Sequence, residues 1–226
     1  MRKIALGMAV AVSAIAAPAL AKDGQAYIGL DSGVVVDNSV DFRINGRDNA
    51  ATIDQKLGWE LGGLIGYDFG MIRTEAEMAY REQRPDSVSS PVVGVPRFTT
   101  APVAGTYSAT NGEMRTVTAM ANALLDIGGE DGIGFSIGAG AGHAWVSGEN
   151  TVAVGPGWFD DSDHNWAWQG LAQMRVPITD QAEIGLKYRY LNTMRMNYRD
   201  TAGRANSFEL ASHSAMISLI ANLGAS

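Results

Sequence analysis

Apolar and polar residues alternate along most of the chain, and this period of two is typical of β-strands whose two faces differ in polarity. We count eight such segments of about 10–15 residues, longer than the usual strand of ~5–6 residues. They cover residues 25–36, 56–69, 71–82, 113–127, 133–146, 165–178, 183–196 and 208–223. No segment of convincing length has the 3.6-residue period of an amphipathic helix, so the pattern predicts an all-β fold.

Short turns and long polar connections alternate between these segments. The short turns are built around Gly70, residues 128–132 and residues 179–181, whose Gly and Asp residues favour tight hairpins. The long connections span residues 37–55, 83–112, 147–164 and 197–207. Outer-membrane barrels have short periplasmic turns and longer extracellular loops. We therefore predict an up-and-down barrel with four mobile long loops, the Pro-rich second one having room for an extra hairpin.

The two faces of the predicted strands have the polarity of a membrane barrel. In the segment 71–82, apolar side chains share one parity and four charged side chains share the other. An outer-membrane barrel turns its apolar face to lipid and its polar face inward. Unpaired charges in a narrow interior are costly, and the near-balance of acids and bases suits ion pairing. The alternative, a soluble sheet whose charges face water, stays open at this point. The expected barrel-interior charge network comprises Asp31, Glu60, Asp68, Arg73, Glu75, Glu77, Arg81, Arg115, Asp126, Arg175, Glu183, Lys187 and Arg189.

Aromatic residues fall near both ends of the predicted strands. Amphipathic rings prefer the membrane interface, where they form girdles in outer-membrane barrels. The expected interface aromatics are Trp59, Tyr67, Tyr80, Phe135, Trp145, Trp166, Trp168, Tyr188 and Tyr190.

The N-terminus has the features of a secretory signal peptide. Arg2 and Lys3 precede an apolar run, and residues 19–21 end in a small–x–small pattern. The run is shorter than the ~20 residues that a spanning helix needs. We predict that residues 1–21 are a signal peptide, cleaved after Ala21, and that residues 22–226 form one barrel domain.

Several segments occur in a characteristic order along the chain: residues 26–30, 73–77 with 80–81, Asn122, 168–172, 185–191 and 213–214. In this order they resemble the opacity-protein-like, OmpA-type eight-stranded outer-membrane barrels, within the porin family. The resemblance implies an eight-stranded antiparallel up-and-down transmembrane β-barrel in the outer membrane. It also implies contact with outer-membrane lipids and lipopolysaccharide, and passage through periplasmic chaperones and the barrel-assembly machinery. Such barrels usually finish with Phe or Tyr, whereas the aligned position here is Leu223.

Composition narrows the chemistry. The absence of cysteine excludes disulfides and thiolate metal sites, and the net charge of −7 argues against a nucleic-acid partner. His143, His164 and His213 do not have the spacing of metal ligands. The acidic run 160–163 lacks the pattern of a calcium loop, and we interpret it as a solvated loop. No Ser, His and carboxylate converge as a hydrolase requires. We expect no catalytic residues, no cofactor and no metal site.

The expected function is structural. Eight strands leave an interior just wide enough for side chains to fill it. We expect a monomer that supports the envelope and presents its loops for contact with other cells, host molecules or phage. One alternative is a narrow porin-like channel, opened when a pair such as Glu75–Arg189 exchanges partners. Another is a soluble lipocalin-like binder of an apolar ligand, and a third is a lipid-modifying enzyme.

Overall fold

The computed structural model describes residues 24–36, 39–96, 99–108, 110–127, 132–152 and 157–223. The predicted signal peptide and most of the turn 128–132 lie outside these ranges. The described residues form fourteen β-strands. No helix that is long and apolar enough to cross a membrane occurs among them.

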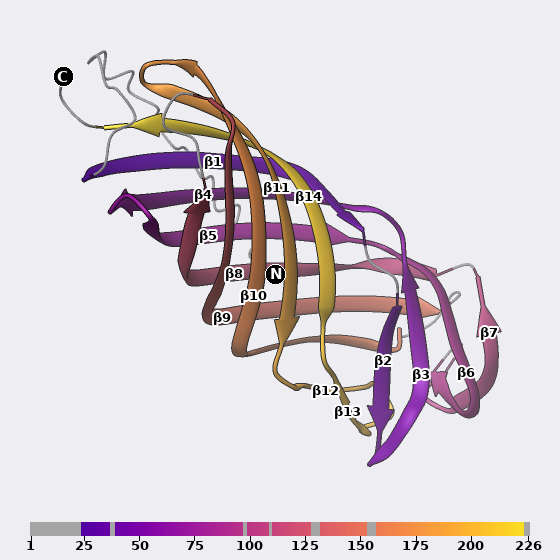
Figure 1. Cartoon of the computed structure of the whole chain (residues 1–226). Helices are drawn as coiled ribbons and strands as arrows, with labels where there is room; N and C mark the ends of the chain where they lie inside the picture. The colour runs from indigo at the N-terminus through magenta and orange to yellow at the C-terminus, as the bar shows by residue number, and fades with distance from the viewer. Residues whose placement is uncertain are drawn as a thin grey trace, which may run out of the picture.

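Eight strands close into an antiparallel barrel (Figure 1). Each pairs with the next along the chain, and the last pairs with the first from Tyr27↔Asn222 to Val36↔His213. A closed barrel has no unpaired strand edge, as a membrane requires. The predicted fold class is confirmed. β9 and β10 each run six residues beyond their predicted bounds, into the long connection predicted between them. The barrel strands are β1 (Gln25–Val36), β4 (Gly58–Asp68), β5 (Ile72–Gln83), β8 (Thr110–Ile127), β9 (Gly134–Val152), β10 (Phe159–Thr179), β11 (Ala182–Thr193) and β14 (Ala211–Asn222).

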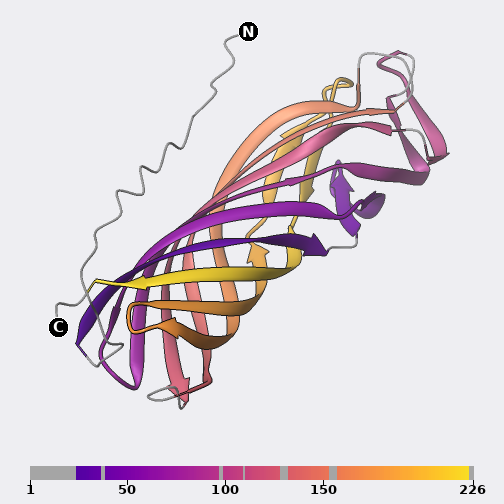
Figure 2. The same ribbon diagram turned by 90° about the horizontal axis from the view of Figure 1, so that it is seen from above.

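Three of the long connections contain a second sheet of six strands, which we call the cap sheet. It lies beyond one end of the barrel in both views (Figures 1 and 2). The expectation of mobile loops was therefore wrong for these segments, and the Pro-rich connection does contain an extra hairpin, β6–β7. Along the sheet, the strands are β12 (Met196–Arg199), β13 (Ala205–Phe208), β2 (Ser39–Ile44), β3 (Arg47–Gln55), β6 (Pro85–Pro96) and β7 (Pro102–Tyr107).

The hairpin β2–β3 shows why these residues form strands. Val40, Phe42 and Ile44 alternate with polar residues and are buried. Asn45 and Gly46 form the turn with φ angles of 48° and 82°. An Asn-Gly pair with both φ angles positive is the favoured two-residue hairpin turn. The sequence contains both the alternating apolar residues and the Asn-Gly pair of this hairpin. They lie within a connection that is polar overall, so the pattern analysis did not predict strands there.

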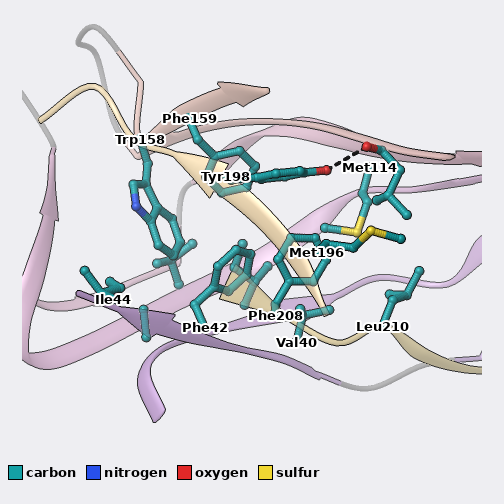
Figure 3. Close-up of a cluster of buried hydrophobic side chains, with 14 of the residues drawn as sticks. Val40, Phe42, Ile44, Met114, Trp158, Phe159, Met196, Tyr198, Phe208 and Leu210 are labelled. Carbon is teal, nitrogen blue, oxygen red and sulfur yellow. Dashed lines mark hydrogen bonds between the residues drawn. The ribbon is translucent and has the colours of Figure 1, made fainter. Parts of the chain in front are cut away.

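An apolar cluster, the cap core, packs between the cap sheet and the strands that rise from the barrel. Phe42 lies at its centre, with ring centroids 5.0 Å from Trp158 and 4.7 Å from Phe208. Tyr198 donates a hydrogen bond of 2.9 Å to the Val146 carbonyl (Figure 3). Burial and the nearby carboxylates of Asp161 and Asp163 raise the Tyr198 pKa, so the phenol stays a neutral donor. The cap core comprises Val40, Phe42, Ile44, Ala50, Ala51, Ile53, Val88, Val95, Met114, Met120, Ala144, Val146, Val152, Trp158, Phe159, Ala167, Leu191, Met196, Tyr198, Phe208 and Leu210.

The acidic run of β10 holds one edge of the cap sheet. The Asp163 carboxylate accepts the Asn197 N–H at 2.8 Å, and the Asp161 carboxylate accepts the Arg199 N–H at 2.8 Å. These side chains satisfy backbone groups on β12 that an edge strand leaves unpaired. Interpreting the run as a solvated loop was therefore wrong, because two of its carboxylates join the cap sheet to a barrel strand.

We expect Phe42→Ala to destabilise the cap by about 3–5 kcal/mol, since a fully buried ring is lost from the middle of its core. Limited trypsin digestion of the folded protein should then cleave rapidly at cap arginines such as Arg43 and Arg47. Val92→Ala is the control because Val92 is 61% exposed, and it should digest at the wild-type rate. Unchanged resistance of Phe42→Ala would contradict a cap held by this core.

Candidate functional site

The outward side chains of the barrel form an uncharged wall. Along β5, the residues of one parity from Ile72 to Tyr80 include no charge, and Met78 is 56% exposed. Ile65 on β4 and Ile217 on β14 are also more than half exposed. So large an exposed apolar surface marks contact with lipid or with another protein. The wall has the polarity of a membrane barrel and the reverse of that of a soluble one.

All nine predicted interface aromatics lie on this outward side. Seven lie toward the cap end, with centroid distances of 5.3 Å for Trp59–Tyr80 and 5.4 Å for Trp168–Tyr190. Tyr67 lies near the opposite end of the strand that carries Trp59. The interval between them matches the ~9–11 tilted residues with which a strand crosses a bilayer. Their anchoring role at the interface stays a prediction. The seven are Trp59, Tyr80, Trp145, Trp166, Trp168, Tyr188 and Tyr190.

Near the short turns, the barrel interior holds a chain of four charges. Asp126 lies 2.8 Å from the guanidinium nitrogens of both Arg73 and Arg175. Arg175 in turn lies 2.9 Å from Glu183. Arg73 also donates to Ser136 Oγ at 2.7 Å. The ion pairs tie β5, β8, β10 and β11 together, and the hydrogen bond to Ser136 adds β9.

Toward the cap, Arg189 is the centre of a second set of charges. Its guanidinium lies 2.7 Å from Glu77 and also contacts Glu60. Glu60 pairs with Arg81 at 2.9 Å and accepts the Ser214 hydroxyl at 2.6 Å. These five side chains are all buried. Paired in this way, they meet the requirement that buried charges have partners.

Lys187 joins this set to β1. Its ammonium group lies 2.6 Å from Asp31, which also accepts the Ser218 hydroxyl at 2.5 Å. The ion pair links the two strands that flank β14 in the barrel, which are far apart in sequence. It therefore fixes the positions of β11 and β1 relative to one another.

Three residues of the predicted charge network lie outside the two sets of ion pairs described above. The structure places Arg115 outside the interior, where it is half-exposed and paired with Glu113, so that prediction was wrong. Its parity is that of outward-facing Val117. Asp68 is on the inward parity at the rim, and its carboxylate accepts the Gly70 N–H at 2.7 Å. Glu75 is buried and accepts the Tyr27 hydroxyl at 2.9 Å.

Neutral polar residues complete the interior; the strand pattern predicts their inward position but not the partners of their hydrogen bonds. Gln169 donates to Asn122 at 2.7 Å, and Asn122 donates to both Glu75 and Glu77. Their signal was parity: each occupies an inward position on its strand. The next inward residue toward the cap is apolar in each case, Met120 after Asn122 and Ala167 after Gln169. The cap core thus begins directly above the polar interior.

The titratable residues outside the interior do not gather into a metal site. Within the described ranges, no three His, Asp or Glu residues are placed to hold a metal ion. The His143 and His164 rings are 6.5 Å apart on the outer wall. His213 is bonded through Nδ1 to the Tyr188 hydroxyl at 2.6 Å.

With this geometry established, comparisons define the class of protein: an outer-membrane β-barrel. Residues 7–211 match the family model of the outer membrane protein beta-barrel domain, and the chain belongs to that family. The family resemblance seen in the sequence is thereby confirmed.

Two solved structures show the same fold. The outer membrane protein OprG from Pseudomonas aeruginosa aligns with a TM-score of 0.58 at 13% identity, over 90% of this chain and 98% of its own. Neisserial surface protein A aligns with a TM-score of 0.50 at 12% identity, over 87% of this chain and 96% of its own. A search of curated proteins finds no match.

We expect Glu60→Ala to destabilise the barrel by about 3–5 kcal/mol, since it leaves buried Arg81 and Arg189 short of a counter-charge. Urea-induced unfolding in lipid vesicles measures the change. Glu209→Ala breaks an ion pair with Arg195 in which both side chains are 54% exposed, and it should cost at most about 1 kcal/mol. Equal effects of the two substitutions would argue against an interior that depends on ion pairing.

Arginine substitution should locate the membrane on the outer wall. Ala121→Arg places a charge midway along the outward face of β8 and should cost about 2–4 kcal/mol in vesicles. Ser162→Arg places it on β10 beyond the aromatic residues, where water solvates it, and should cost about 0–1 kcal/mol. A larger cost at Ser162 than at Ala121 would mean that the membrane lies elsewhere.

Proposed function

We propose that this protein is a non-conducting outer-membrane barrel that anchors a rigid cap at the cell surface as a contact surface. The observation that carries the proposal is the closed column of side chains inside the barrel. The ion pairs around Arg189 fill the lumen, and the cap core lies directly above them. An eight-stranded barrel has just enough interior volume for such filling.

The orientation follows from the lengths of the connections. Outer-membrane barrels place short turns in the periplasm and long connections outside the cell. The cap sheet is built from the long connections, so it would face the exterior. A cleaved signal peptide at residues 1–21 and assembly by periplasmic chaperones and the barrel-assembly machinery belong to the same proposal. The uncharged wall would then contact outer-membrane lipids and lipopolysaccharide.

A folded cap suits recognition better than mobile loops do. A rigid surface loses less conformational entropy when it binds a partner. The solvent-facing side of the cap carries both charge signs, and a polar hollow of about 380 Å³ opens there between Arg43, Asp48, Arg195 and Glu209. We propose that this side contacts other cells, host molecules or phage, and that the protein acts as a monomer without enzymatic activity.

Two alternatives have less support. The soluble binder needs an apolar interior, whereas this barrel has charges inside and apolar residues outside. The narrow channel was expected to depend on exchange of a Glu75–Arg189 pair. Arg189 pairs instead with Glu60 and Glu77, and Glu75 bonds to Tyr27 and Asn122. A passage would require both ion pairs and the cap core to separate.

The test is conductance in planar lipid bilayers. We expect the folded wild-type protein to give no steps above baseline under conditions in which a 16-stranded porin conducts. A double variant, Glu77→Ala with Arg189→Ala, empties part of the lumen but leaves the cap core above it, and it should also stay closed. Regular wild-type steps that disappear in the double variant would overturn the proposal in favour of a channel.

A further inference from the structure

The polar hollow of about 380 Å³ on the solvent-facing side of the cap lies where β2 and β13 run next to each other. Its lining includes two arginines, Arg43 and Arg195, and two carboxylates, Asp48 and Glu209. The volume is at the lower end of the ~300–1,000 Å³ of small-molecule pockets. None of the four residues belongs to the barrel interior or to the cap core, so the stability of the fold does not account for their arrangement.

A bulge in the hairpin β2–β3 brings two polar side chains of β3 to the hollow. Residues 48–50 of β3 lie opposite the single residue Arg43 of β2. One of them, Asn49, has a φ angle of 49°, in the left-handed region that residues other than glycine rarely adopt. Asp48 and Asn49 both line the hollow, whereas neighbours in a regular strand point to opposite faces. Bulges and strained backbone of this kind are concentrated at functional sites.

The charges of the hollow are paired with one another. Arg43 donates from Nε and Nη2 to the two Asp48 oxygens at 2.6 and 2.8 Å. The hydrogen bonds from Arg43 lower the Asp48 pKa, and the charge of Arg195 acts in the same direction, so this carboxylate stays ionised. Arg195 also lies 3.5 Å from Glu209. An anionic ligand would have to displace Asp48 from the guanidinium of Arg43, and a cationic one would have to compete with an arginine for either carboxylate. The hollow therefore favours an uncharged ligand.

The groups that can bind such a ligand are both donors and acceptors. A guanidinium has more N–H groups, and a carboxylate more lone pairs, than one ion pair uses. Asn49 adds an amide, and Ser39 and Ser207 add hydroxyls. A ligand rich in hydroxyl groups matches this lining, because each hydroxyl both donates and accepts. The apolar lining is limited to Phe208 and Ala211, which leaves no apolar pocket for the aromatic anchors that dominate protein–protein interfaces.

We propose that the hollow binds one uncharged sugar unit of a glycan on a facing cell, through hydrogen bonds to the hydroxyl groups of the sugar. This inference rests on the proposed function, because it names the class of molecule that the cap contacts. The sugar would lie between Asn49 on β3 and Arg195 on the connection from β11 to β12. Both side chains should therefore be needed for binding.

The experiment is an oligosaccharide microarray, probed with the folded protein in lauryldimethylamine oxide, a detergent without a sugar head group. The array carries uncharged glycans that end in each common hexose or N-acetylhexosamine, together with sialylated and sulfated glycans. The chain has no cysteine, so Asp180→Cys, in the short turn at the opposite end of the barrel, takes the fluorophore. We expect the wild-type protein to bind at least one uncharged glycan, and sialylation of that glycan not to strengthen binding.

Two variants remove a side chain from different elements of the hollow, Asn49→Gly and Arg195→Ala. Glycine adopts a positive φ readily, so Asn49→Gly keeps the backbone. In calorimetric titrations each should weaken binding of the best uncharged glycan by about tenfold, the effect of losing one or two hydrogen bonds. The matched controls are Asn45→Gly, at a φ of 48° in the β2–β3 turn, and Arg84→Ala, whose ion pair with Glu82 lies outside the hollow. Both controls should bind within about twofold of wild type.

Resistance to trypsin shows that the cap of each variant is folded before it is titrated. Absence of wild-type binding to every uncharged glycan would overturn the proposal, and so would unchanged affinity of both hollow variants. Stronger binding of a sialylated or sulfated glycan, lost in Arg195→Ala, would make the ligand an anion and reject an uncharged sugar. Equal losses in the controls and in the hollow variants would mean that the sugar binds elsewhere. Conductance, which tests the proposed function, is independent of all these outcomes.

Discussion

Ion pairing inside a closed barrel is the constraint on which the rest of this structure depends. Arg189 lies in the lumen, out of reach of both water and lipid, and is stable there because Glu60 and Glu77 lie against it. A buried arginine without counter-charges would be strongly destabilising. Charges on β4, β5 and β11 must therefore meet, and this requirement fixes the relative register of strands that are distant along the chain.

The same constraint separates the molecule into regions of different polarity. The buried charges of the barrel strands all point inward. The outward side chains that face lipid are therefore uncharged. On the cap side, apolar inward residues such as Met120 on β8 and Ala167 on β10 join the cap core, alongside buried polar residues such as Thr118. These apolar residues allow the cap sheet to pack on the barrel mouth through a hydrophobic core. The cap is therefore held on the barrel by this core and by the chain connections that contain its strands.

The sequence was sufficient to predict the barrel but not the cap. Barrel strands are long and alternate in polarity over their full length, so their number, faces and order follow from period and parity. Cap strands such as Ser39–Ile44 are short, and their burial depends on Trp158 and Phe208, which no local pattern connects to them. Arg115 was assigned to the interior because it is charged, although its position along β8 has the parity of the outward face. The partners of individual charges, such as Glu77 for Arg189, depend on strand register, which period alone does not define.

Site-directed spin labelling of β8 tests most sharply whether the barrel interior is closed to both lipid and water. The chain has no cysteine, so single cysteines at residues 119 to 123 each report one position. In vesicles, we expect collisions with lipid-soluble oxygen to be frequent at Ala119, Ala121 and Ala123. Labels at Met120 and Asn122 should be shielded from oxygen and from a water-soluble nickel complex alike. Ready access of the nickel complex to Met120 and Asn122 would show that the interior is open to water, and oxygen accessibility with the opposite parity would show that the two faces are reversed.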